Sequence, residues 1–301
     1  MKSLISYFFI LFLWVCASCN SEFSNTEKDP ICDNSELLCQ ISSFNDSISK
    51  SKVITRSRSA DFLYWMSVVS ADCAGAYEGG RFGIKCGAIV GHPHVGAAIG
   101  ALVAGGWSSY LTHRALTRSI EQDELQVPIK VVGALTAAKE QNVSITDNFA
   151  KNIILPLPIT ETEIREIGAK HNIVLQNLIE NNIDTTNIRE HITDEELDII
   201  QSEEFKLNCK IATEKIQNYF SSGHIQQTAG VTISDKLMNM FYEVYQEYSD
   251  SCEDAQFIIS KYTEAVVGTS ELSEEDKQIV LQAISVAASS YEFWMPNTNN
   301  N

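Results

Sequence analysis

The chain has 301 residues, of which 44% are hydrophobic, and this apolar content is enough for one large or two small cores. Its formal net charge of -17 at pH 7 excludes a general nucleic-acid-binding surface, which needs a positive footprint. The same acidic balance disfavours electrostatic docking onto anionic lipid and is explained most simply by solubility.

The first residues predict a signal peptide over residues 1–18. A basic start is followed by an apolar run from Leu4 to Val15, which has signal-peptide length and is too short to span a membrane. The next residues, Cys16-Ala17-Ser18-Cys19, resemble a bacterial lipobox, although Leu, Val or Ile is usual at the position of Cys16. This resemblance implies cleavage before Cys19 and attachment of lipid to it, whereas an ordinary secretory signal would be cut at the same place. We therefore expect a lipid-anchored protein of the cell envelope, at the outer membrane or cell surface, or otherwise a secreted one.

Residues 19–58 are predicted to form a tether between the anchor and the folded part. They are rich in Ser, Asn, Asp and Lys, with a single apolar cluster at Glu36–Ile41, and a lipoprotein needs such a spacer. Ser47-Ile48-Ser49-Lys50 has the spacing of a serine–lysine nucleophile. We interpret that match as chance because it lies in the tether.

Cysteine usage agrees with an exported chain. Once Cys16 is removed and Cys19 is lipidated, proximity along the chain suggests the pairs Cys32–Cys39, Cys73–Cys86 and Cys209–Cys252. The second pair requires a break near Gly79-Gly80, because 13 residues of continuous helix would separate the two cysteines by about 20 Å. The alternative is that several of them are buried thiols. The spacings match no zinc site, and we expect no metal.

A row of glycines dominates residues 59–118, where a helical hairpin is predicted. The glycines recur every four residues on both sides of His92-Pro93-His94: Gly75, Gly79, Gly83, Gly87, Gly91, Gly96 and Gly100. A glycine inside a helix costs about 1 kcal/mol relative to alanine, and close contact with another backbone would compensate. Because Pro93 disfavours helix at His92, we expect helices over residues 60–91 and 95–117 with their glycine faces in contact. His92 and His94 are interpreted as exposed turn residues rather than a metal or pH-sensing site.

This glycine row resembles the glycine zippers of membrane-active peptides, including bacteriocin-like peptides and pore-forming toxins, over roughly residues 71 to 106. The resemblance implies that the seven glycines are the packing face and that the hairpin enters a membrane or associates with other copies. Glu78, Arg81 and Lys85 depart from it, because charges at a bilayer centre are costly. The alternative is a hairpin buried permanently in a water-soluble domain.

Residues 119–158 are predicted to be a linker, and residues 159–295 an acidic α-helical domain. Residues 121–301 hold 30 acidic and 12 basic side chains. Apolar residues at helical spacing follow sequences that can cap a helix, such as Thr160 with Glu163, Thr193 with Glu196, and Ser273. Further helices are expected from about Ser234 and Asp254. The Asn-rich tail at residues 296–301 is expected to be disordered.

Two motifs of this domain resemble those of uncharacterised bacterial lipoproteins that also carry a glycine-rich hairpin. They are Ile167-Gly168-Ala169-Lys170-His171-Asn172 and the terminal stretch from Ser285 to Trp294. The resemblance implies no known activity. We interpret His171 as a hydrogen-bonded packing residue on an apolar face, with a role in a functional site as the alternative.

Motifs of catalysis are missing from the sequence, which has no Gly-x-Ser-x-Gly, no phosphate loop and no His-Glu-x-x-His. We therefore predict a mainly α-helical, non-enzymatic lipoprotein without cofactor. Its partners are expected to be membrane lipid through the anchor, and membrane or self through the hairpin, but not nucleic acid. The alternative function is a cell-envelope scaffold or binding protein with the hairpin as a permanently buried core.

Overall fold

The computed structural model describes residues 35–51, 60–89, 91, 93–117, 161–180, 194, 198–199, 202–203, 207 and 232–295. The described residues belong to one compact unit and are mostly helical, so the predicted mainly α-helical fold is confirmed. The signal peptide, lipidation at Cys19, the linker at 119–158 and the tail at 296–301 lie outside the described residues.

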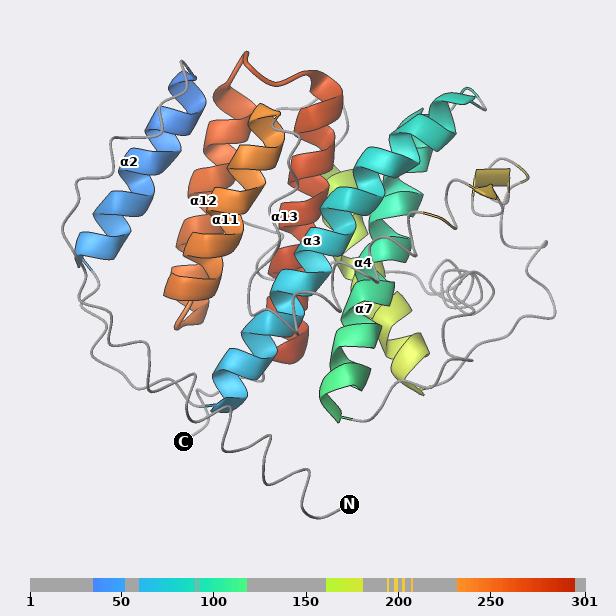
Figure 1. Ribbon diagram of the computed structural model, residues 1–301, viewed down its shortest axis with the longest axis horizontal. Coiled ribbons are helices and arrows are strands. Elements are labelled where there is room, and N and C mark those ends of the chain that lie inside the picture. Colours follow the sequence, from blue (N-terminus) through green and yellow to red (C-terminus); the bar gives the residue numbers. More distant parts are fainter. Residues whose placement is uncertain are drawn as a thin grey trace. The chain divides into compact units, whose positions relative to one another are not determined.

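The predicted hairpin is present as two long helices, α3 (Ala60–Ile89) and α4 (Pro93–Thr117), which pack along their length (Figure 1). Gly91 makes the turn between them with φ +85, a backbone conformation that glycine adopts without strain. Pro93 then begins α4, where its missing N–H costs nothing because a first-turn donor has no partner within the helix. The helix α3 is continuous through Gly79 and Gly80.

Five further helices complete the described part: α2 (Glu36–Ser51), α7 (Glu161–Glu180), α11 (Ile233–Tyr248), α12 (Cys252–Gly268) and α13 (Glu274–Trp294). The last three begin at capping residues whose side chains accept from a backbone N–H three residues on, namely Thr232, Ser251 and Ser273. Asp235 closes a capping box with Thr232.

The last helix, α13, occupies the centre of the packing. It contacts α3, α4 and α7 on one side and α11 and α12 on another. It is buried almost all round, from Lys277 to Tyr291. The run from Ala283 to Ser290 consists mostly of small side chains, which lets several helices approach one axis. A helix that is buried on every side is a core element.

The tether predicted for residues 19–58 is wrong over Glu36–Ser51, which form α2 and pack against α11 and α12. One face of this helix is apolar and buried, through Leu37, Leu38, Ile41 and Ile48. The helix start is also anchored, because the N–H of Leu37 donates to Glu271 Oε1 at 2.9 Å. Packing against distant parts of the chain therefore makes this segment helical, although its local composition is polar.

Candidate functional site

The two helices of the hairpin touch backbone to backbone. A Cβ built on Gly83 would lie 1.9 Å from the carbonyl oxygen of Gly96, and one on Gly79 would lie 2.1 Å from that of Gly100. Real Cβ contacts stay beyond about 3 Å, so a side chain at either position would force the helices apart. The contact accounts for the regular spacing, since a row without side chains is what close helix approach requires.

The other predicted packing glycines divide into two groups. A Cβ on Gly75 would lie 2.6 Å from the carbonyl oxygen of Ala104, and the Cα of Gly87 lies 2.8 Å from a Cβ built on Gly96. Both therefore belong to the contact. Gly91 does not, because a Cβ there would meet nothing within 4 Å. Its assignment to the packing face is corrected to the turn, where the positive φ explains the glycine.

Two of the predicted disulfides are absent. Cys73 and Cys86 hold buried thiols on one continuous helix, too far apart to bond, and Cys252 is an exposed thiol and so does not bond Cys209. The thiol of Cys73 donates to the carbonyl oxygen of Ala283 at 3.2 Å. Cys39 is disulfide-bonded. Its predicted partner, Cys32, lies outside the described residues, so that pairing stays a prediction.

A polar junction lies where α3, α4, α7 and α13 meet, and its centre is Asp72. The side chain of Asp72 is fully buried. Its Oδ2 accepts hydrogen bonds from Ser290 Oγ and, at 3.3 Å, from Trp294 Nε1. The same indole nitrogen also donates to Ser109 Oγ at 3.2 Å. We name the set Asp72, Ser109, His171, Ser290 and Trp294 the buried polar junction.

The predicted candidate His171 is part of this junction. Its ring is fully buried, and Nε2 lies 3.9 Å from Asp72 Oδ2, beyond hydrogen-bond distance. The other nitrogen, Nδ1, contacts Asn172 Oδ1 at 3.2 Å. Neither His171 Nε2 nor Asp72 Oδ1 has a hydrogen-bond partner among the described residues. The side chains of Asp72 and His171 thus lie close together in a region closed to solvent, and each has one polar atom without a hydrogen-bond partner among the described residues.

The two motifs that resembled other lipoproteins meet at this place. A Cβ on Gly168 would lie 2.5 Å from the carbonyl oxygen of Ser285, so α7 and α13 also approach backbone to backbone. Asn172 Nδ2 donates to the carbonyl oxygen of Ser289 at 2.8 Å, and Ser285 Oγ donates to that of Ile164 at 2.8 Å. The motifs therefore mark one helix–helix contact, which ends at the buried polar junction.

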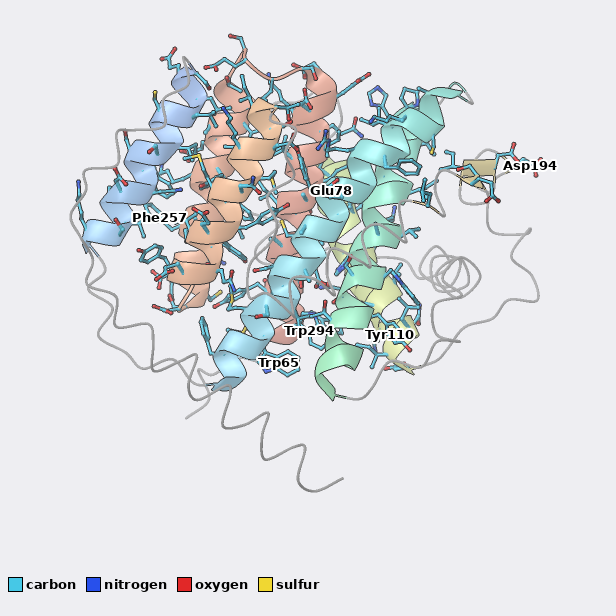
Figure 2. All side chains as sticks on the ribbon, viewed as in Figure 1. Trp65, Glu78, Tyr110, Asp194, Phe257 and Trp294 are labelled. Atoms are coloured by element: carbon cyan, nitrogen blue, oxygen red, sulfur yellow. The ribbon has the colours of Figure 1, made fainter. Side chains whose placement is uncertain are left out.

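Trp294 also carries an aromatic contact that joins the ends of two helices. Its ring stacks on Trp65 of α3, with centroids 5.0 Å apart and planes inclined by 19°. Figure 2 labels Trp65 and Trp294 close together at the lower ends of α3 and α13. Trp294 thus contacts the first turns of α3 through the face of its ring and Asp72 through its indole N–H.

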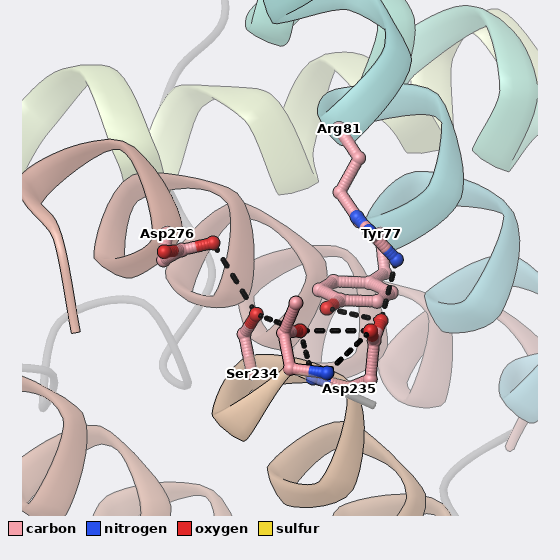
Figure 3. A network of polar contacts seen from close by, with 6 residues as sticks. Tyr77, Arg81, Ser234, Asp235 and Asp276 are labelled. Carbon is pink, nitrogen blue, oxygen red and sulfur yellow. Dashed lines mark hydrogen bonds and ion pairs between the residues drawn. The ribbon is translucent and has the colours of Figure 1, made fainter. Parts of the chain in front are cut away.

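A second polar network ties the hairpin to the start of α11 (Figure 3). Tyr77 Oη donates to Asp235 Oδ1 at 2.9 Å, and Arg81 reaches the same oxygen at 2.5 Å. Burial raises the pKa of Tyr77, so its hydroxyl stays protonated. Ser234 Oγ donates to Asp276 Oδ1 at 3.2 Å and so links the starts of α11 and α13. Arg81, one of the charged departures from a membrane zipper, therefore serves packing within the domain, together with Tyr77.

The remaining sequence candidates do not gather into a site. His94 lies at the start of α4, with Nδ1 2.6 Å from Gln278 Oε1, and His92 lies outside the described residues. Ser47 and Lys50 are exposed on α2, where nothing makes them a catalytic pair. Within the described ranges, no group of three His, Cys, Asp or Glu side chains is placed to hold a metal ion.

Sequence reasoning missed Asp72 and Asp235, and it included Ser290 and Trp294 only within the terminal motif, without a role for either. One signal was present: Asp72 is a lone acid in the otherwise apolar and small-residue stretch from Val68 to Tyr77. Such an acid on a buried helix needs partners from other helices. Its partners could not be identified, since they lie about 100 and 220 positions further along the chain.

Of the helices described, none is long and apolar enough to span a membrane. Comparison with known proteins found no protein-family model, no curated protein and no solved structure that matches this chain.

Proposed function

We propose that this chain is an exported, lipid-anchored, non-enzymatic protein of the cell envelope, in which the glycine-rich hairpin is the permanent core of a helical scaffold or binding protein. The observation that carries the proposal is that the glycine faces of the hairpin are occupied by each other and that other helices of the domain pack on both arms. The glycines of α3 face those of α4, while α13 covers α3 and α7 covers α4.

Polar contacts support a permanent rather than a temporary core. Asp72 bonds to Ser290 and Trp294, and Tyr77 with Arg81 bonds to Asp235. A hairpin that entered lipid would lose these partners and leave buried polar groups unsatisfied, at a cost of several kcal/mol each. The geometry therefore favours a hairpin that stays in the domain.

The burial of the polar junction supports the proposed non-enzymatic role. Asp72, Ser109 and His171 have relative exposures of 0%, so a substrate would not reach them while the four helices are packed. Ser290 donates to the carboxylate instead of to the histidine, which is not the order in which a base activates a serine nucleophile. The junction acts in our proposal as a packing element.

Membrane interaction or self-association of the hairpin is the second candidate. It is favoured by the stretch from Cys86 to Thr112, which contains no Asp, Glu, Lys or Arg. It requires α7 and α13 to leave the hairpin first. In that case a protein lacking the acidic domain, residues 159–295, would be more membrane-active than the full chain.

The experiment that separates the candidates is dye release from lipid vesicles. Release is the readout, because a lipid anchor alone gives binding without leakage. We expect the purified full-length protein, and a Cys19→Ala variant without the anchor, to release no dye and to remain monomeric. Leakage by the Cys19→Ala variant would overturn the scaffold function in favour of the second candidate. Mass analysis of the mature N-terminus tests the lipidation of Cys19 separately.

A further inference from the structure

The buried polar junction contains one pair of titratable side chains that no hydrogen bond joins. Asp72 faces Ser109 of α4, His171 of α7 and Ser290 and Trp294 of α13. Of these, His171 is the titratable one. Cys73, beside Asp72 on α3, stays a thiol because burial raises its pKa well above the ordinary value. The protonation of the junction therefore depends on Asp72 and His171.

Burial shifts these two groups in opposite directions. It raises the pKa of Asp72 from 3.8 to about 8, against the hydrogen bonds from Ser109, Ser290 and Trp294, which lower it. It lowers the pKa of His171 from 6.5 to about 4, against the contacts with Asn172 and the backbone of Gly105. Between these limits the packed junction holds a single proton, on Asp72, and carries no charge.

We propose that Asp72 and His171 form a one-proton latch, which keeps α7 and α13 closed on the hairpin while the proton is held and opens the junction when the proton is lost. The latch regulates the same covered hairpin on which the proposed scaffold function rests. It stands on geometry, because the four helices meet at two fully buried groups with spare hydrogen-bond capacity.

The direction of the response follows from counting protons. In an opened junction both side chains meet water and return to their ordinary pKa values, 3.8 for Asp72 and 6.5 for His171. Between pH 4 and 6.5 the closed form holds its proton on Asp72 and the open form holds one on His171, so the opening equilibrium is independent of pH. Between pH 6.5 and 8 only the closed form holds a proton, and opening increases about tenfold per pH unit. The equilibrium constant for opening therefore rises on the alkaline side, by about 30-fold in total between pH 6.5 and 8.

Replacing either partner reshapes this profile in a way that a merely structural role would not. Asp72→Asn leaves the histidine alone, so opening increases as the pH falls from 6.5 to 4 and is flat above 6.5. His171→Gln leaves the acid alone, so opening increases tenfold per pH unit from about pH 4 to 8. The double variant removes the pH dependence across the whole range.

The test is hydrogen–deuterium exchange of the full-length protein between pH 4 and 9, corrected for the intrinsic pH dependence of exchange. The expected signal is loss of protection in segments 164–178 and 283–294, with α12 as the internal control. A wild-type profile that is flat between pH 6.5 and 8, or an alkaline rise that survives in Asp72→Asn, overturns the latch.

A second measurement decides the case if the variants do not fold. Carbon-detected NMR of the wild-type protein, labelled at its aspartate carboxyl carbons, is expected to show Asp72 protonated at pH 6.5. A carboxylate already ionised at that pH overturns the proposal. Neither measurement involves lipid, so a failed latch is distinguishable from a failed scaffold function, which the vesicle experiment tests.

Discussion

Gly83 and Gly96 face each other across the hairpin so closely that a Cβ on Gly83 would lie 1.9 Å from the carbonyl oxygen of its partner. The obstacle is backbone, which cannot rotate away as a flexible side chain would. Gly83→Ala is therefore expected to lower the free energy of unfolding by about 2 kcal/mol or more, although alanine favours helix by about 1 kcal/mol.

Gly268→Ala is the matched control for this change. A Cβ on Gly268 meets nothing within 4 Å at the end of α12. Alanine there restricts the unfolded chain and should raise the stability by about 0.5 kcal/mol. Chemical denaturation of both variants measures the difference, and equal effects at the two sites would show that the hairpin contact is looser than described.

Gly168→Ala is expected to separate α7 from α13. The new methyl group would lie 2.4 Å from Ser289 Oγ and 2.5 Å from the carbonyl oxygen of Ser285. Removing the hydroxyl in a Gly168→Ala, Ser289→Ala double variant should restore only part of the lost stability, because the carbonyl remains. Thermal unfolding of the single and double variants tests this, and full rescue would mean that the backbones do not touch.

Trp294→Phe is expected to act on Asp72 as well as on packing. The variant loses the indole N–H that donates to Asp72, and with it a contribution that lowers the pKa of that acid. The pKa of Asp72 should rise above about 8, and the near-ultraviolet circular dichroism of the Trp65–Trp294 stack should disappear. Trp107→Phe, at another buried tryptophan, is the control that changes the spectrum without moving the titration.

Arg81→Met is expected to destabilise more than Tyr77→Phe. The carboxylate of Asp235 has a side-chain exposure of only 5%, so removing its cation leaves a buried charge with hydroxyl and backbone donors alone. Losses of about 2 kcal/mol for Arg81→Met and about 1 kcal/mol for Tyr77→Phe are expected. Lys261→Met breaks an exposed pair with Glu264 and should change stability by less than about 0.5 kcal/mol. A similar small loss at Arg81 would mean that the network is not stabilising.

The helix α2 gives a simple proteolysis test. Because its apolar face packs on α11 and α12, limited digestion of the full-length protein should spare bonds near Leu37, Leu38 and Ile41. Leu38→Asp should make this segment cleavable, while Gln40→Asp, on the exposed face, should not. Rapid cleavage of the unmodified protein here would restore the tether interpretation.

The hairpin was predictable because its signal is local. The glycines that recur every four residues predict the contact between the two helices, and Pro93 predicts the position of the turn. The start of α13 at Ser273 is local in the same sense, since a cap needs only the next three residues.

The buried polar junction was not predictable, because its members come from four helices. His171 drew attention as a histidine on an apolar face, but only the packing of α7 and α13 on the hairpin brings it to Asp72. The helix α2 was missed for a related reason. Its polar composition resembles a tether until α11 and α12 supply the surface that its four apolar residues cover.

The backbone contact between α3 and α4 also restricts how the two helices can slide. In the present alignment Gly79 faces Gly100 and Gly83 faces Gly96. A shift of one residue would place Ala97 instead of Gly96 opposite Gly83. A shift of one whole turn, about 6 Å, would instead bring Gly83 opposite Gly100 and Gly87 opposite Gly96. Because the glycines repeat every four residues, only alignments that differ by four residues bring glycine opposite glycine. Intermediate alignments of the two helices are sterically disfavoured.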